Sequence, residues 1–234
     1  MLNGKLVGVT GRLLSNDLET PTTRRIRIAL DGKPFSYRAG QAASLTAGGV
    51  ATPYSIASSP SETSRYGWLE FLVKVDGSNR FGAIVDQLQL NASVDLTGPA
   101  GGFTLDSVAD GPILFVAGGT GIAPMRSMIR EAIASHREGA LSLIYSSRTP
   151  EEFAYLRELK ELAAEGRLNL TLTLTGDAQD WMHARGRTGI SHLAELVRPN
   201  TTAFVCGPPA MVADVPAALT SLGIARDRVV TENW

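Results

Sequence analysis

The sequence predicts a two-domain protein, an antiparallel β-barrel followed by a doubly wound α/β domain. Three observations predict this fold class. Up to about residue 105, short alternating segments are separated by turns rich in Gly, Pro and Asn. From Gly111 onward, buried strand patterns alternate with amphipathic helical patterns. A small polar break, residues 108–112, lies between the two parts, so we place the domains at 1–108 and 109–234.

Composition excludes several classes of function. The chain has 234 residues, 44% of them hydrophobic, and a net charge of −1, which indicates no nucleic-acid-binding surface. One cysteine excludes an internal disulfide, a four-cysteine zinc site and a self-contained iron–sulfur cluster, and the three scattered histidines suggest no metal site. The N-terminus lacks the apolar run of a signal peptide, and no stretch reaches about 18 apolar residues. We therefore expect a cytoplasmic protein with no membrane partner.

Alternation of apolar and polar residues marks the strands of the first domain. Strand candidates are Arg25–Leu30, Trp68–Val75 and Val94–Thr97, the last of which runs into Gly98. Within the second candidate, one face carries Leu69, Phe71 and Val73. One helix is predicted at about Gly82–Leu88, where Ile84, Val85 and Leu88 share a face. Many short strands of this kind favour a barrel or a sandwich.

Two segments of the first domain have side chains suited to binding. Residues 52–59 place Tyr54 beside hydroxyl groups, and an aromatic ring offers a flat face while Ser55 can donate or accept a hydrogen bond. The alternative is an ordinary strand with a half-buried tyrosine. Residues 76–82 form a polar turn that opens the predicted helix, where Arg80 and free N–H groups suit an anion. The alternative there is a solvated turn with a surface arginine.

The second domain reads as five parallel strands joined by helical crossovers. The strand candidates are Ile113–Ala117, Leu141–Tyr145, Leu168–Leu174, Ala203–Cys206 and Val229–Thr231. Between them, apolar residues recur at helical spacing in four groups: Met125, Met128, Ile129, Ala132 and Ile133; Phe153, Leu156 and Leu159; Leu193, Leu196 and Val197; and Met211, Val215, Ala218, Leu219 and Leu222. This order predicts a doubly wound parallel sheet.

Ligands of such sheets bind beyond the carboxyl ends of the strands, so the residues that follow each strand are candidate ligand contacts. The first strand ends in the glycine turn 118–121, whose N–H groups and following helix suit a phosphate, although its spacing is not G-x-G-x-x-G. The other strand ends bring Ser147 and Arg148, Thr175 and Gly176, Cys206 to Pro209, and Glu232 to Trp234. Each of these residues taken alone also has a structural interpretation. Cys206 would be a small buried apolar residue, Glu232 a surface acid and Trp234 part of a frayed terminus.

Six motifs in one order resemble the ferredoxin–NADP reductase family of flavoproteins over nearly the whole chain. They are P-Y-S at 53–55, G-P at 98–99, G-G-T-G-I-A-P at 118–124, the aromatic-x-x-R-T segment at 145–149, C-G-P-P at 206–209 and the terminal E-x-aromatic at 232–234. The resemblance implies that the barrel carries FAD and that the α/β domain carries NADPH or NADH. It also implies that the two cofactor rings meet where the domains adjoin.

The resemblance assigns roles to individual residues. Tyr54 would lie against the flavin, Ser55 near its N5, and residues 77–82 near its pyrophosphate. Cys206 and Glu232 would line the place where the nicotinamide meets the flavin, and Trp234 would cover the isoalloxazine ring or pack against the FAD adenine. The residues implied in catalysis are Ser55, Cys206, Glu232 and Trp234. Those implied in cofactor binding are Thr52, Pro53, Tyr54, Ser55, Lys74, Val75, Gly77, Arg80, Phe81, Gly82, Gly118, Gly119, Thr120, Gly121, Ser147, Arg148, Cys206, Gly207, Pro208 and Trp234.

The sequence departs from the family pattern at three places. Thr52 stands where the family usually has an arginine that contacts the flavin phosphates, and Gly82 stands where Ser or Thr is common. We hypothesise that Arg80 replaces the missing cation, and FMN is an alternative to FAD. Thr175-Gly176 stands where NADP-selective members have Ser-Arg, which leaves both coenzymes open, with Arg148, Arg185 and Arg187 as other candidates for a 2′-phosphate.

The function implied is an NAD(P)H-dependent flavoprotein oxidoreductase. It would pass electrons from the nicotinamide through FAD to a separate acceptor protein such as a ferredoxin, a flavodoxin or an oxygenase component. The chain has no cysteine cluster for an iron–sulfur acceptor of its own. Two alternatives stand beside this prediction: a free-flavin reductase that uses flavin as a substrate, and a binding module that kept the fold without the flavin.

Overall fold

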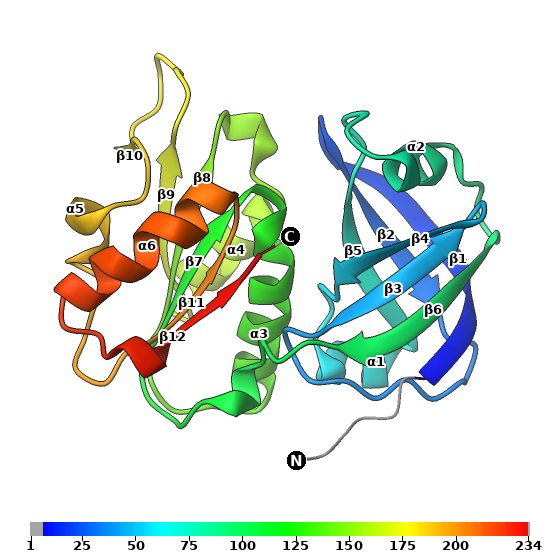
Figure 1. Ribbon diagram of the computed structural model, residues 1–234, viewed down its shortest axis with the longest axis horizontal. Coiled ribbons are helices and arrows are strands. Elements are labelled where there is room, and N and C mark those ends of the chain that lie inside the picture. Colours follow the sequence, from blue (N-terminus) through cyan, green and yellow to red (C-terminus); the bar gives the residue numbers. More distant parts are fainter. Residues whose placement is uncertain (1–6, 234) are drawn as a thin grey trace. The chain divides into compact units, whose positions relative to one another are not determined.

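The computed structural model describes residues 7–233 and divides into two compact units (Figure 1). The first unit holds the chain up to Ser107 together with Arg126–Ala134. The second holds Val108–Met125 and the chain from Ser135 onward. The change of unit falls one residue before the predicted boundary. The sequence pattern did not anticipate that residues 126–134 would pack with the first unit.

The first unit is a curled antiparallel sheet of six strands, which confirms the predicted class of this half. Its strand order is β4-β3-β6-β1-β2-β5. The strands are β1 Val7–Thr20, β2 Thr23–Ala29, β3 Ala42–Ala47, β4 Val50–Ser55, β5 Trp68–Lys74 and β6 Ser93–Ala100. The two edge strands curl toward each other, because Ile56, just after β4, bridges to Phe71 of β5, and the Ala57 N–H donates to the Glu70 carbonyl at 2.7 Å.

Two helices belong to this sheet. Helix α2 (Arg80–Gln87) lies close to the predicted position and buries Phe81 and Val85 against the sheet core. Helix α1 (Pro60–Tyr66) was missed. Its signal was present in the sequence as a capping box, in which the Ser59 side chain accepts from the Glu62 N–H and the Glu62 carboxylate accepts from the Ser59 N–H.

The sequence placed Leu69, Phe71 and Val73 on one face of β5, and the structure buries both faces of this strand. Leu69, Phe71 and Val73 are buried as expected, but Glu70 is also fully buried and Leu72 is nearly so. The outer face of β5 is covered because α1 packs on it and Arg126 of α3 (Ile122–Ala134) reaches the Glu70 carboxylate at 3.6 Å. A strand covered on both faces does not need a polar side.

The second unit is a parallel sheet with helices on both faces, as predicted. Its order is β10-β9-β8-β7-β11-β12, so six strands replace the predicted five, the extra one being the two-residue β10. The strands are β7 Ile113–Gly118, β8 Leu141–Ser147, β9 Asn169–Leu174, β10 Ala184–Arg185, β11 Thr202–Cys206 and β12 Val229–Glu232. The remaining helices are α4 Leu156–Ala164, α5 Ile190–Leu193 and α6 Pro209–Ser221.

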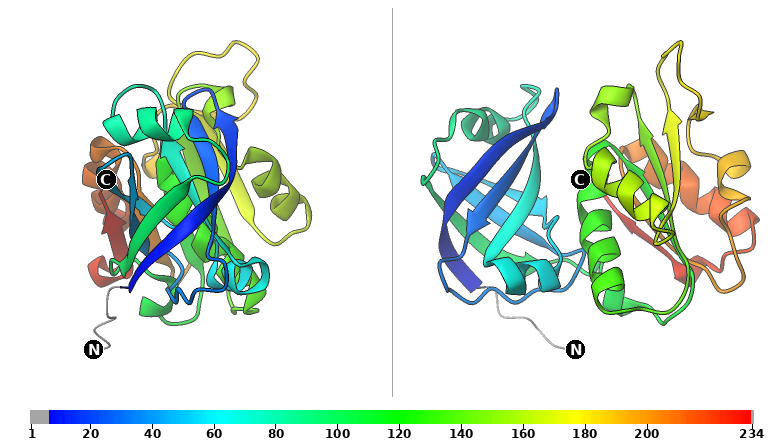
Figure 2. Two further views of the ribbon diagram at one scale, coloured as in Figure 1. Left: turned by 90° about the vertical axis from the view of Figure 1, so that its right-hand side faces the viewer. Right: turned by 180° about the vertical axis from the view of Figure 1, so that it is seen from behind.

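Figures 1 and 2 show α4 and α6 on opposite faces of the parallel sheet. On the α6 side, Val215 and Leu219 pack in one core cluster with Leu114, Val116 and Val205 of the central strands. Short 3₁₀ turns occur at Leu105–Ser107, Gly119–Gly121, Pro150–Glu152 and Arg226–Arg228. Within residues 7–233, no helix combines the length and the apolar character needed to cross a bilayer.

Candidate functional site

The P-Y-S motif lies at the end of β4, an edge strand of the first unit. Pro53 lacks an N–H group and is tolerated at a sheet edge. The ring of Tyr54 packs on Phe81 of α2, with centroids 5.4 Å apart, and remains half-buried. Burial raises the pKa of Tyr54 to about 12, so its hydroxyl stays protonated. Ser55 is buried beside it and Thr52 is half-buried. The segment therefore presents an aromatic face held by a second ring.

The predicted phosphate segment forms an ordered turn between β5 and α2. Lys74 pairs with Asp76 at 2.9 Å, and Asp76 accepts from the Ser78 N–H at 3.0 Å. Asn79 caps α2 by accepting from the Gly82 N–H at 2.6 Å. Arg80 is exposed, and its guanidinium makes no hydrogen bond or ion pair with any other residue from 7 to 233. It is thus a cation at a helix N-terminus, the place where an anion is favoured.

The structure gives a physical reason for the departure at Gly82. A Cβ atom at this position would lie 2.0 Å from the Lys74 carbonyl oxygen. No side chain fits there, since β5 and the first turn of α2 approach each other through backbone atoms. Serine or threonine is therefore excluded at position 82 in this backbone arrangement, and the predicted site must bind phosphate without a hydroxyl from this residue.

In the second unit, strand register gathers the predicted residues at the carboxyl edge of the sheet. Cys206 at the end of β11 lies beside Ala117 of β7 on one side and Glu232 of β12 on the other. Gly118 at the end of β7 lies beside Ser146 of β8. The strand-end residues that the sequence analysis placed at the carboxyl edge therefore lie on adjacent strands along that edge.

The glycine turn and the C-G-P-P turn are in direct backbone contact. A Cβ atom at Gly121 would lie 2.3 Å from the Cys206 carbonyl oxygen, and one at Gly118 would lie 2.7 Å from Pro208. A Cβ atom at Gly207 would lie 3.0 Å from the Gly118 nitrogen. Gly119 adopts φ +54°, a left-handed conformation that favours glycine. Gly118, Gly121 and Gly207 are thus required by the close approach of the two loops, and Gly119 by its backbone conformation. Together they leave a stretch of backbone without side chains, which is suited to a phosphate.

Tyr145 supports the glycine turn, although the sequence marked it only as a landmark. Its hydroxyl donates to the Gly119 carbonyl at 3.1 Å and accepts from the Ala154 N–H at 3.2 Å. The ring is fully buried and meets Phe153 edge-on with centroids 5.0 Å apart. The sequence feature that could have predicted this support is a tyrosine near the end of a buried strand, because a buried tyrosine hydroxyl needs a hydrogen-bond partner.

The ends of β8 and β9 are joined by backbone hydrogen bonds. The Thr175 N–H and hydroxyl both donate to the Ser147 carbonyl, at 2.9 and 3.2 Å, so the Thr175 hydroxyl is already used. The Ser147 hydroxyl is buried without a hydrogen-bond partner among residues 7–233. Arg148 is exposed, and its guanidinium makes no hydrogen bond or ion pair with the other residues from 7 to 233. Arg185, by contrast, bonds the carbonyls of Ala178 and Trp181.

Cys206 is 1% exposed. Burial, and secondarily the nearby Glu232 carboxylate, raises the pKa of its thiol to about 12. The sulfur is therefore a protonated, weakly polar group at neutral pH and not a nucleophile. It can line a ring-binding surface without reacting with it.

We expect Cys206 in the folded protein to resist a thiol reagent such as dithionitrobenzoate at pH 8, since attack requires an exposed thiolate. The same thiol should react fully after denaturation in guanidinium. The chain contains one cysteine, so the absorbance of the released thiolate reports this residue alone. Equal rates in the folded and denatured states would show that the thiol is accessible.

The structure thus forms two groups of predicted residues, one in each unit. The first contains Tyr54, Ser55 and the β5–α2 turn, and the second contains the glycine turn, Cys206 and Glu232. Trp234 lies outside the described residues. No cluster of three or more His, Cys, Asp or Glu side chains within residues 7–233 is arranged to hold a metal ion.

Known proteins identify the family. A family model described as the oxidoreductase NAD-binding domain matches residues 115–216. Ferredoxin–NADP reductase B of Sorangium cellulosum strain So ce56 is 32% identical over 218 residues, which cover 87% of this chain and 88% of that protein. The chain belongs to the ferredoxin–NADP reductase family. The resemblance drawn from the six motifs is confirmed, and so is the prediction of an oxidoreductase.

Other members of the ferredoxin–NADP reductase family match over most of the chain. The ferredoxin–NAD(P)(+) reductase component of the naphthalene 1,2-dioxygenase system of Pseudomonas putida is 29% identical, covering 96% of this chain and 68% of that protein. The fold matches the crystal structure of a ferredoxin NADP+ reductase from Neisseria gonorrhoeae with bound FAD and NADP. Its TM-score is 0.80 at 23% identity, covering 97% of this chain and 98% of that one.

Proposed function

We propose that this protein takes electrons from NADH or NADPH, passes them through FAD, and delivers them to a separate acceptor protein such as a ferredoxin, a flavodoxin or an oxygenase component. The observation that carries the proposal is the glycine turn locked against the C-G-P-P turn at the carboxyl edge of the parallel sheet. It supports a nucleotide phosphate site of the family's kind, in a chain that spans 88% of a ferredoxin–NADP reductase.

The residues of the first unit fit a flavin dinucleotide. When bound, FAD supplies a ring that accepts a hydride and releases single electrons. Tyr54 would offer its half-buried face to that ring, and the adjacent Ser55 would offer a hydroxyl. Arg80 and the N-terminus of α2 would neutralise phosphate charge, because Arg80 has no other partner among the described residues.

The residues of the second unit fit a nicotinamide nucleotide. Backbone N–H groups of the glycine turn would face its pyrophosphate, since Gly119 is exposed and has open space where a side chain would stand. Cys206, held protonated, and Glu232, its neighbour on β12, would orient the reacting end of the coenzyme by polar contact. The proposal covers both coenzymes: Arg148 is free to meet a 2′-phosphate, whereas Thr175 is already bonded to Ser147.

A cytoplasmic location is part of the proposal. Reduced nicotinamide coenzymes are supplied there, and the predicted acceptors are themselves proteins that exchange electrons with such reductases.

The experiment that tests the function starts with the purified protein. We expect a yellow preparation whose flavin, released by denaturation and separated by chromatography, is FAD. Under anaerobic conditions, NADH or NADPH should bleach the visible flavin absorbance, and the difference in rate between the two identifies the coenzyme. Flavin that is lost on desalting but reduced when added back would instead indicate a free-flavin reductase. A colourless protein that neither binds nor reduces added flavin would overturn the proposal and favour a binding module.

A further inference from the structure

Helix α2 ends in a single backbone cap bond, from the Leu88 N–H to the Val85 carbonyl at 3.1 Å. It contains eight residues, which is too few for a stable isolated helix. Leu88, the residue after it, is extended with φ −70° and ψ 126°, so the helix ends without the left-handed glycine that commonly satisfies the last carbonyl groups. Contacts from outside the helix therefore add to this one bond in holding the end.

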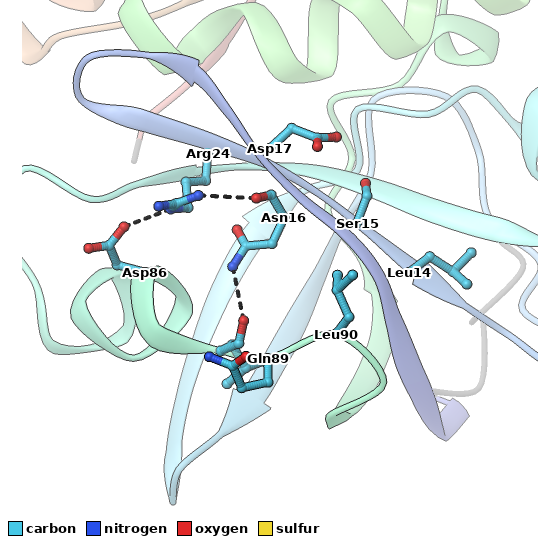
Figure 3. Close-up of a pocket in the computed structure, with 9 residues that line it drawn as sticks. Leu14, Ser15, Asn16, Asp17, Arg24, Asp86, Gln89 and Leu90 are labelled. Carbon is cyan, nitrogen blue, oxygen red and sulfur yellow. Dashed lines mark hydrogen bonds and ion pairs between the residues drawn. The ribbon is translucent and has the colours of Figure 1, made fainter.

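Two side chains of the β1–β2 hairpin hold it (Figure 3). The Asn16 amide donates to the Val85 carbonyl at 2.7 Å and to the Leu88 carbonyl at 3.3 Å. Arg24 donates from Nε to the Asp86 carboxylate at 2.6 Å and from Nη1 to the Asn16 carbonyl at 3.0 Å. The side chains of Arg24 and Asp86 are only 24% and 38% exposed, so water weakens this pair less than it weakens a fully exposed one.

The clamp formed by Asn16 and Arg24 borders a cavity of about 330 Å³ between β1 and the chain that follows α2. Leu14, Leu88 and Leu90 line the same space. This space is open to solvent, since Leu14 and Leu90 are 39% and 59% exposed, so packing is incomplete on this side of the helix end only. Val85 and Leu88 pack on the core from one side of this end, and the polar contacts of the clamp hold it from the side of the cavity.

The opposite end of α2 carries Arg80 and the N–H groups that the proposed function assigns to the flavin phosphates. A helix of eight residues is about 12 Å long and moves as a rigid rod. We propose that Asn16 and Arg24 are positioning residues for flavin-phosphate binding: by fixing the C-terminal end of α2, they fix the direction in which its N-terminus points. This inference rests on the proposed function.

The test compares the dissociation constants of FAD and riboflavin, since riboflavin has the same ring without phosphate. Asn16→Asp replaces the donor with a carboxylate that faces two carbonyl groups, and Arg24→Met removes the pair with Asp86. Both variants should weaken FAD binding by about tenfold relative to riboflavin binding. Arg24→Lys, which keeps the charge, should restore part of the loss. If Asn16 and Arg24 only stabilised the fold, the variants would weaken the binding of FAD and of riboflavin by the same factor.

Arg25→Met is the matched control. Arg25 lies next to Arg24 on β2 and pairs with Asp17 and Glu19 of β1, so its loss removes the same charge and loosens the same hairpin without touching α2. Its ratio of FAD to riboflavin affinity should match that of the unaltered protein. Equal losses for the two ligands, or a control that behaves like Arg24→Met, would refute the positioning role. Failure of the unaltered protein to bind FAD would overturn the proposed function itself, and this inference with it.

Discussion

An Arg126→Met variant should lose about 3–5 kcal/mol of unfolding free energy, the largest change that we expect from a single substitution. The Arg126 guanidinium bonds both oxygens of Glu62, at 3.0 and 3.1 Å, and the Ala57 carbonyl at 2.8 Å. It also lies 3.6 Å from the carboxylate of Glu70. The side chains of Arg126 and Glu62 are 7% and 11% exposed, so its removal leaves the Glu62 carboxylate without its main cation, whereas the fully buried Glu70 keeps Arg27 at 2.8 Å.

Arg130→Met provides the control on the same helix. Arg130 approaches Glu62 at 3.3 Å but is 34% exposed, and Glu62 keeps Arg126 in this variant. The loss should therefore stay near or below about 1 kcal/mol. Urea denaturation followed by circular dichroism measures both values. Similar losses in the two variants would contradict the assignment of Arg126 as the main partner of the Glu62 carboxylate.

The pH dependence of the same variants gives an independent check. Burial alone would raise the pKa of Glu62, but Arg126, the Ser59 N–H and Arg130 outweigh it and hold that pKa below its ordinary value of 4.5. In the unaltered protein, this lowered pKa contributes stability at neutral pH that is lost as the pH falls through the folded-state pKa. Without Arg126, the pKa of Glu62 should rise, because its strongest lowering cause is gone while burial remains, and protonation then removes a poorly compensated buried charge. The stability difference between the unaltered protein and Arg126→Met should thus shrink from pH 7 toward pH 4.

The second large effect is expected on flavin affinity. Arg80→Ala should raise the dissociation constant of FAD by about 10- to 100-fold, because a charge-assisted phosphate contact contributes about 1.5–3 kcal/mol. Arg80 is exposed and unpaired within residues 7–233, and Thr52 and Gly82 supply neither a cation nor a hydroxyl in the usual places. Fluorescence titration of the flavin-free protein with FAD measures the change.

Arg65→Ala is the control for this prediction. Arg65 is also exposed in the first unit, but it lies on α1 over the ring of Tyr66, 5.2 Å from its centroid. Its removal changes the net charge equally and should leave FAD affinity within about twofold. If Arg80→Ala binds FAD as tightly as Arg65→Ala does, Arg80 does not replace the missing arginine at position 52.

Local pattern was sufficient for the central strands of the second unit. Its central strands are buried on both faces and read as continuous apolar runs, so Ile113–Ala117 and Leu141–Tyr145 were found within two residues of their ends. The carboxyl-edge rule then placed Cys206, Gly118 and Glu232 together, because strand order and register determine which residues share an edge. Two-residue β10 escaped notice, since two residues carry no period.

The sequence by itself determined the class of each half, the motifs at the sheet edge and the family, because these depend on short-range periodicity and on residue types in order. Only the tertiary structure decided which residues support them. Tyr145 under Gly119, Arg126 against Glu70 and Asn16 at the end of α2 each join segments 26 to 72 residues apart. Such contacts arise from chain topology and the need to satisfy buried polar groups, and no local pattern encodes which distant partner will satisfy them.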